Sequence, residues 1–140
     1  MFSLCWRDVD LHAALLTVRG SNAKNGSTRV IPLNPDMVEM LTAWRPDPCT
    51  SSAFVFPSRT GGRLSEIKTA WGELMKAATI TGFRFHDCRH DFASKLVMDG
   101  EDLNTVRVLL GHADLKMTLR YAHLAPSKTA AAVARLNVAR

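Results

Sequence analysis

Apolar and polar positions in the first half of the chain form short β-type runs and then a helical period. Residues 14–19 (ALLTVR) and 28–33 (TRVIPL) are β-prone, and the turn formers GSNAKNGS separate them. Two such runs around such a loop predict a β-hairpin. The pair Asn34-Pro35 supplies an N-cap and a first-turn proline, and apolar residues follow at helical spacing. This pattern predicts a helix over residues 35–44.

A short strand is predicted over residues 53–56 (AFVF), and Ser65 is predicted to cap a helix that reaches Ala78. The second half is predicted to be mostly helical, because apolar residues recur three and four positions apart between capping residues. This order indicates an α+β fold with a small antiparallel sheet, and the length of 140 residues fits a single domain over residues 1–140. The chain is predicted to turn helical from Phe85, with Gly100 as a C-cap. Asp102 is predicted to cap a second helix that Gly111 ends, and Asp114 to cap a third over Leu115 to about Leu124; a last helix is predicted from near Ser127.

Composition and charge narrow the class of protein. A chain with 46% hydrophobic and 22% charged residues is globular, which excludes collagen, low-complexity disorder and a coiled-coil rod. It contains no apolar run of roughly 18 residues that would span a membrane, and the early charges of Arg7 and Asp8 argue against a signal peptide. Three cysteines without paired spacing favour a reduced, cytoplasmic protein. The net charge of +5 favours an anionic partner, with nucleic acid the first candidate.

A cluster of cationic and titratable residues in the second half suggests phosphate chemistry. His86 and Arg89 are three positions apart, so they share one face of a helix. A guanidinium gives a bidentate fork to phosphate oxygens, and an imidazole hydrogen-bonds or exchanges a proton. His112 follows the helix-ending Gly111, and Tyr121, the only tyrosine, stands nine residues later. Its phenol is a candidate covalent nucleophile.

These motifs, in order and spacing, resemble the catalytic domain of the tyrosine recombinase (phage integrase) family. That family carries His-x-x-Arg, then Gly-His, then a tyrosine about nine residues on, and residues 85–124 match all three elements. Residues 4–11 (LCWRDVDL) resemble the family's L-x-W-x-D-I-D-L stretch. Residues 23–33 (AKNGSTRVIPL) resemble the hairpin that carries its active-site lysine. The resemblance covers nearly the whole chain and implies an enzyme that breaks and rejoins DNA.

The resemblance also implies a role for each site residue. Tyr121 would attack the scissile phosphate to form a 3′-phosphotyrosyl link, while Arg89 holds the non-bridging oxygens. Lys24 would protonate the leaving 5′-oxygen. His86 would assist proton transfer at the tyrosine, and His112 would donate a hydrogen bond to the phosphate. Cationic side chains stabilise the developing charge, so no metal and no other cofactor is expected.

One element of the family pattern is missing from this alignment. The family places its first catalytic arginine in an Arg-x-x-Glu-Leu/Ile segment, and Met1 occupies the Leu/Ile position. We therefore expect a truncated catalytic domain, without that arginine and without the amino-terminal core-binding domain, that is weak or inactive alone. The expected partners are double-stranded DNA and further copies of the chain on DNA, since full-length relatives act as four protomers. No membrane partner is expected.

Other interpretations of the same residues stay open. The chain could be a non-catalytic DNA-binding or assembly remnant of an integrase, or have a type IB topoisomerase-like activity. A zinc site is disfavoured, because no HExxH or paired-cysteine pattern accompanies the histidines. His90 and His123 are predicted to be structural or to support the site residues without contacting the DNA. Five basic residues are candidates for phosphate contacts, although isolated basic residues are more often only solvated: Arg59, Arg63, Arg84, Lys116 and Arg120.

Overall fold

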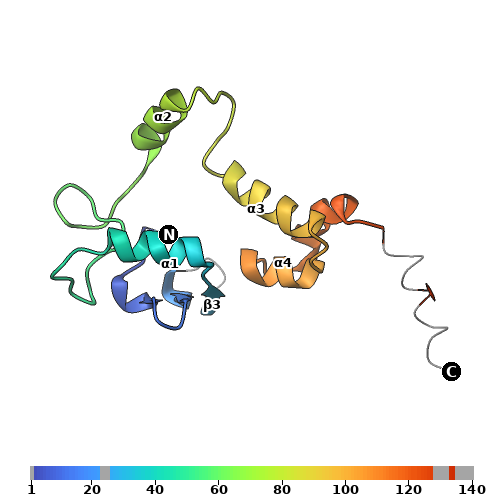
Figure 1. Ribbon diagram of the computed structural model, residues 1–140, viewed down its shortest axis with the longest axis horizontal. Helices are drawn as coiled ribbons and strands as arrows, with labels where there is room; N and C mark the ends of the chain where they lie inside the picture. The colour runs from blue at the N-terminus through green and yellow to red at the C-terminus, as the bar shows by residue number, and fades with distance from the viewer. Residues whose placement is uncertain (1, 23–25, 128–132, 135–140) are drawn as a thin grey trace. The chain divides into compact units, whose positions relative to one another are not determined.

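The computed structural model describes residues 2–22, 26–127 and 133–134. It forms two compact units, Met1–Ala78 and Thr79–Arg140, which are described separately below (Figure 1). The α+β class is confirmed, because the first unit holds an antiparallel sheet and the second contains only helical elements in its described part. That residues 1–140 act as one domain stays a prediction.

The first unit is built on a three-stranded antiparallel sheet in the order β1-β2-β3. The predicted hairpin is formed by β2 (Leu15–Val18) and β3 (Arg29–Pro32), with Leu16 opposite Ile31. A two-residue strand β1 (Val9–Asp10), which the hydrophobic pattern did not predict, pairs with the other side of β2. The loop of the hairpin includes residues 23–25, which lie outside the described part of the chain.

Two helices follow the sheet. Helix α1 (Pro35–Trp44) has the predicted bounds, and the side chain of Asn34 caps it by accepting a hydrogen bond from the Met37 N–H at 2.9 Å. Helix α2 (Lys68–Ala77) starts later than predicted, with Ile67 at its N-cap. The prediction that Ser65 caps it is wrong. An N-cap oxygen must reach the second or third helical N–H, and Ser65 lies two residues before the N-cap position.

The core of the first unit contains Trp6, Leu41 and Val55, each at most 4% exposed. A 3₁₀ turn, η1 (Trp6–Asp8), precedes β1, and the backbone of Trp6 donates to the Ala53 carbonyl at 3.0 Å. The predicted strand over 53–56 is wrong, because this segment forms only an isolated bridge between Phe54 and Cys5. The η1 turn on one side and Pro57 on the other prevent the bridge from extending into a ladder.

The second unit packs helix α3 (Asp87–Met98) against α4 (Leu103–Leu110) and the 3₁₀ segment η4 (Leu119–Leu124). Asp102 caps α4 as predicted, and Gly111 ends it in the left-handed region at φ 69°. The core residues share near-complete burial: Ala93, Val97, Val106, Leu110 and Tyr121.

Three predictions for this unit need correction or fall outside the described residues. Helix α3 begins at Asp87, not Phe85. Residues 115–124 form the 3₁₀ turns η3 (Leu115–Met117) and η4 instead of one α-helix, because their backbone bonds join each N–H to the carbonyl three residues earlier. The helix predicted from Ser127 lies almost wholly outside the described residues. Within the described ranges, no helix combines the length and apolar character that crossing a bilayer requires.

Candidate active site

Arg89 is a half-buried residue in the first turns of α3. Its Nη2 donates a short hydrogen bond to the main-chain carbonyl of Leu110, in the last turn of α4. Carbonyls at the end of a helix lack a partner within that helix, so they are free to accept from a side chain. This bond fixes the guanidinium beside the turn that carries Gly111 and His112.

His112 follows the αL glycine at the end of α4 and is partly buried. Its Nδ1 lies 2.8 Å from the hydroxyl of Thr118, which is fully buried. Burial, and then the positive charges of Arg89 and Arg120, hold the pKa of His112 below its ordinary value. These influences favour the neutral imidazole, in which one ring nitrogen carries a proton.

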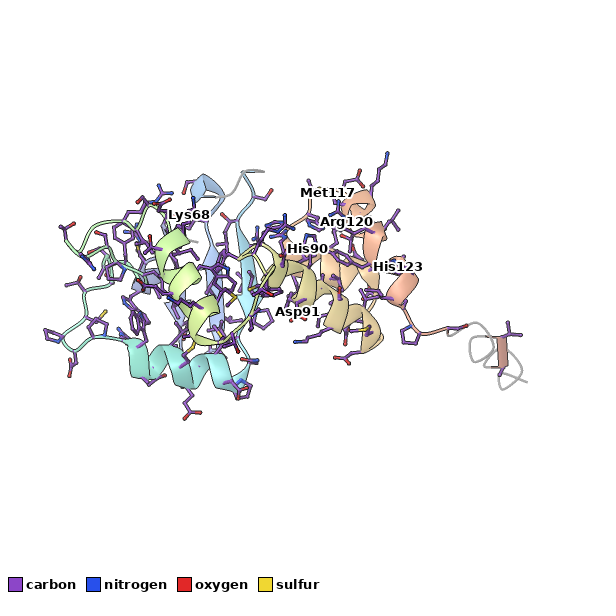
Figure 2. The ribbon with its side chains drawn as sticks, turned by 90° about the horizontal axis from the view of Figure 1, so that it is seen from above. Lys68, His90, Asp91, Met117, Arg120 and His123 are labelled. Atoms are coloured by element: carbon purple, nitrogen blue, oxygen red, sulfur yellow. The ribbon has the colours of Figure 1, made fainter. Side chains whose placement is uncertain are left out.

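Tyr121 lies in η4 and is only 6% exposed. Its hydroxyl is 2.7 Å from Nδ1 of His90, which lies on α3 directly after Arg89 (Figure 2). The ring of His86, at the N-cap of α3, meets the His90 ring edge-on, with 5.1 Å between centroids. The three side chains thus form a row, and His90 is the member in contact with the phenol.

The structure places four of the five predicted site residues in the second unit, and the fifth, Lys24, lies outside the described residues. Arg89, His112 and Tyr121 are positioned by contacts within that unit. His86 is exposed and contacts His90. His90 was predicted to be structural or to support the site residues, and the residue pattern did not indicate its direct contact with the phenol. The only sequence signal was its place next to the motif arginine.

The candidate phosphate-contacting basic residues are exposed, and two of them have informative surroundings. Arg84 is not free to bind DNA without losing a partner, since it donates to both carboxylate oxygens of Asp87 at 2.8 and 3.1 Å. These hydrogen bonds lower the pKa of Asp87 to about 2. Arg120, labelled on η4 in Figure 2, is close enough to His112 to depress the pKa of that imidazole.

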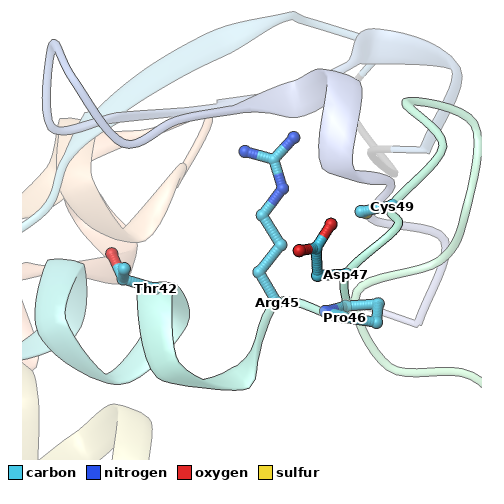
Figure 3. A pocket seen from close by; sticks show the side chains of 5 residues that line it. All are labelled: Thr42, Arg45, Pro46, Asp47 and Cys49. Atoms are coloured by element: carbon cyan, nitrogen blue, oxygen red, sulfur yellow. The ribbon is translucent and has the colours of Figure 1, made fainter.

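None of the predicted site residues that the structure describes lines the surface hollow in the first unit, which Figure 3 shows. That hollow lies at the end of α1, and the guanidinium of Arg45 is 5.6 Å from the centre of the Trp6 ring. In the part of the chain that is described, no three His, Cys, Asp or Glu side chains cluster in a way that could hold a metal ion. The hollow is lined by Thr42, Arg45, Pro46, Asp47 and Cys49.

This fold and this arrangement of arginine, histidine and tyrosine define a known class of protein. The model of the phage integrase family matches residues 1–128, and the chain belongs to that family. Among curated relatives, tyrosine recombinase XerC of Xanthomonas campestris pv. campestris (strain B100) is 38% identical over 127 residues, which cover 87% of this chain and 38% of the relative. Tyrosine recombinase XerD of Pseudomonas putida is 30% identical over 138 residues, covering 91% of this chain and 45% of the relative.

Solved structures agree with this assignment. The catalytic domain of bacteriophage HP1 integrase aligns with a TM-score of 0.65 and 25% identity, over 94% of this chain and 68% of that one. The XerA recombinase aligns with a TM-score of 0.73 and 25% identity, over 99% of this chain and 52% of that one. The chain spans less than half the length of the curated XerC and XerD relatives.

Proposed function

We propose that this chain is the catalytic part of a site-specific tyrosine recombinase, which cuts and rejoins DNA through a phosphotyrosyl intermediate. The observation that supports it most directly is the 2.7 Å contact between the only phenol of the chain and an imidazole nitrogen. The same unit holds a guanidinium and a second, neutral imidazole. A nucleophile, a base and two phosphate-binding groups are the parts that phosphoryl transfer requires.

The phosphate-binding groups in this proposal are Arg89 and His112. Arg89 gives a planar fork of N–H groups to the non-bridging oxygens, and its bond to the Leu110 carbonyl keeps the guanidinium in place. His112 donates a hydrogen bond to one of these oxygens. Both groups are held by the protein before reaction, so they stabilise the pentacovalent transition state with little reorganisation.

Tyr121 is the proposed nucleophile, and its proton goes to His90. The phenol oxygen forms a bond to phosphorus, the bond from phosphorus to the 5′-oxygen breaks, and Lys24 supplies the proton that the 5′-oxygen takes up. His90 replaces His86 as the proposed base, because His90 is the imidazole within hydrogen-bonding distance of the phenol. The edge-on contact of the His86 ring with the His90 ring helps to hold His90 in this orientation.

Double-stranded DNA is the proposed partner, in the cytoplasm and with further copies of the chain bound to the same DNA. The net charge of +5 supports a polyanionic partner. A related fold, that of the XerH recombinase, has been solved bound to its palindromic difH substrate. Binding should weaken as salt rises, since each phosphate contact releases counterions.

Covalent capture on DNA tests the proposal. The chain is incubated with nicked duplexes of randomised sequence, denatured in SDS, and any adduct is mapped by mass spectrometry. We expect a low yield of a phosphotyrosyl peptide containing Tyr121, in keeping with the weak activity expected of this chain alone, and none with the matched Tyr121→Phe variant. An adduct at another residue would contradict the assignment. Salt-sensitive DNA binding without an adduct would favour the non-catalytic DNA-binding module, and relaxation of supercoiled DNA without a preferred site would favour the topoisomerase-like activity.

The role of Lys24 has its own test. Replacing the bridging 5′-oxygen by sulfur gives a thiolate leaving group, which needs no proton. The Lys24→Ala variant should therefore form the adduct slowly on ordinary DNA and at close to the wild-type rate on the sulfur-substituted DNA. Tyr121→Phe should form no adduct on either substrate. If Lys24→Ala is equally impaired on both substrates, Lys24 is not the acid.

A further inference from the structure

Thr118 is a buried polar residue between the two 3₁₀ turns of the second unit. It is 0% exposed, although a threonine hydroxyl needs a hydrogen-bond acceptor for its proton. In the part of the chain that is described, this hydroxyl has one hydrogen bond, to Nδ1 of His112 at 2.8 Å. Its main-chain carbonyl accepts the N–H of Tyr121 at 3.0 Å. One residue thus supports both His112 and the turn that carries the phenol.

The direction of the bond between Thr118 and His112 follows from burial. If Nδ1 of His112 donated its proton to the hydroxyl, the hydroxyl proton would have no acceptor among the described residues and no access to water. A buried, unsatisfied donor is costly, so the hydroxyl must donate and Nδ1 must accept. In a neutral imidazole the proton then resides on Nε2.

We infer that Thr118 is a positioning residue that fixes His112 as the tautomer protonated at Nε2. This inference rests on the proposed function for its consequence, because an Nε2–H group is what a phosphate oxygen can accept from. Among the described residues Nε2 of His112 makes no hydrogen bond to the protein, which leaves it available for a ligand. The opposite tautomer would present a lone pair to the phosphate and repel it.

Nitrogen NMR of the full chain tests the tautomer without any activity. Long-range ¹H–¹⁵N correlation spectra at neutral pH distinguish protonated from unprotonated ring nitrogens, and the signals of His112 are assigned by their loss in His112→Asn. We expect Nδ1 to have the shift of an unprotonated nitrogen and Nε2 that of a protonated one. A neutral ring protonated at Nδ1 would overturn the inference. The wild-type spectrum alone decides this, even if a variant fails to fold.

Two matched variants test the consequence. Thr118→Val keeps the shape of the side chain and removes the hydroxyl, while Thr118→Ser keeps the hydroxyl; both retain the carbonyl that accepts from Tyr121. We expect Thr118→Val to shift His112 toward a mixture of tautomers and to slow adduct formation by about 10- to 100-fold, by analogy with loss of a hydrogen bond that orients a metal-bound histidine. Thr118→Ser should restore the wild-type spectrum and most of the rate.

The outcomes separate this inference from the proposed function. In one outcome the wild-type chain forms no adduct, its His112 is protonated at Nε2, and Thr118→Val loses this tautomer. The positioning role of Thr118 then stands while the proposed function fails. If the wild-type chain forms an adduct and Thr118→Val changes neither the spectrum nor the rate, the proposed function stands and the positioning role is wrong.

Discussion

Replacing Tyr121 by phenylalanine removes one oxygen atom from the core of the second unit, and the structure predicts what this does to stability. The hydroxyl is bonded to Nδ1 of His90 at 2.7 Å, and the ring is packed among buried apolar residues. The ring itself is unchanged in the variant, so the cost is that of the hydrogen bond. His90→Phe removes the same bond from the other side and keeps a planar ring.

The two single variants should not cost the same. In His90→Phe the Tyr121 hydroxyl loses its partner, and the tyrosine is only 6% exposed. Leaving a buried polar group unsatisfied lowers the free energy of unfolding by about 1–3 kcal/mol. In Tyr121→Phe the remaining imidazole is only half-buried, so water replaces the lost partner and the cost is about 0.5–1.5 kcal/mol. The double variant leaves no orphaned group. We therefore expect its cost to be smaller than the sum of the two by about 1 kcal/mol.

Urea unfolding of the four proteins, followed by far-UV circular dichroism, measures this coupling energy. Tryptophan fluorescence is a second probe, because Trp6, Trp44 and Trp71 all lie in the first unit and report whether that unit unfolds together with the second. Additive effects, within about 0.3 kcal/mol, would show that the phenol and the imidazole do not interact in solution. That result would refute both the contact and the assignment of His90 as the base.

Three further predictions concern other contacts. Arg89→Lys should lower the rate of adduct formation by about 10²–10³-fold, as for loss of a preorganised donor, and unchanged capture kinetics would rule out the phosphate-binding role. Asn34→Ala should destabilise the first unit by about 1 kcal/mol through loss of the α1 cap, with Asn34→Asp as the control, measured by tryptophan fluorescence in urea. Arg84 lowers the pKa of Asp87 from its ordinary 3.8 to about 2. The Arg84–Asp87 ion pair therefore stabilises the fold above pH 3.8, and this stabilisation is lost as pH falls through about 2. In Arg84→Gln the carbon-13 NMR titration of the Asp87 carboxyl should move up toward 3.8; no movement would contradict the pairing.

Capping residues, prolines and glycines in the sequence predicted the bounds of those helices that begin and end at such residues. The start of α1 follows from Asn34 and Pro35 and its end from Pro46, while the start and end of α4 follow from Asp102 and Gly111. The strand predicted over 53–56 failed for a tertiary reason. Its partner segment turns into η1 after one bridge, and no local pattern in 53–56 carries that information.

The sequence predicted which residues belong to the candidate site, but it did not predict which of them contact one another. Motif spacing identified Arg89, His112 and Tyr121. The contact of Tyr121 with His90 depends on the 3₁₀ geometry of residues 115–124, which apolar spacing had predicted to be α-helical. In a 3₁₀ turn, residues three apart are eclipsed, so Thr118 and Tyr121 point to the same side, and both are buried. An α-helix would separate them by about 60° and place the phenol elsewhere.

Burial of the nucleophile adds a requirement to the proposed mechanism. The hydrogen bond to His90 has to persist until the proton is transferred, so the reactive state must expose the phenol oxygen to DNA while this bond is kept. Removing the aromatic ring from the core costs about 1.5–3 kcal/mol. At 1.4 kcal/mol for each factor of ten, the exposed phenol has a population on the order of one in ten to one in a hundred. DNA must therefore contact the exposed state better than the buried one, since a ligand shifts an equilibrium only by its differential affinity. The exposed cations of η3 and η4, Lys116 and Arg120, lie on the segment that would move, and so they are the groups through which a phosphate backbone would favour exposure of the phenol.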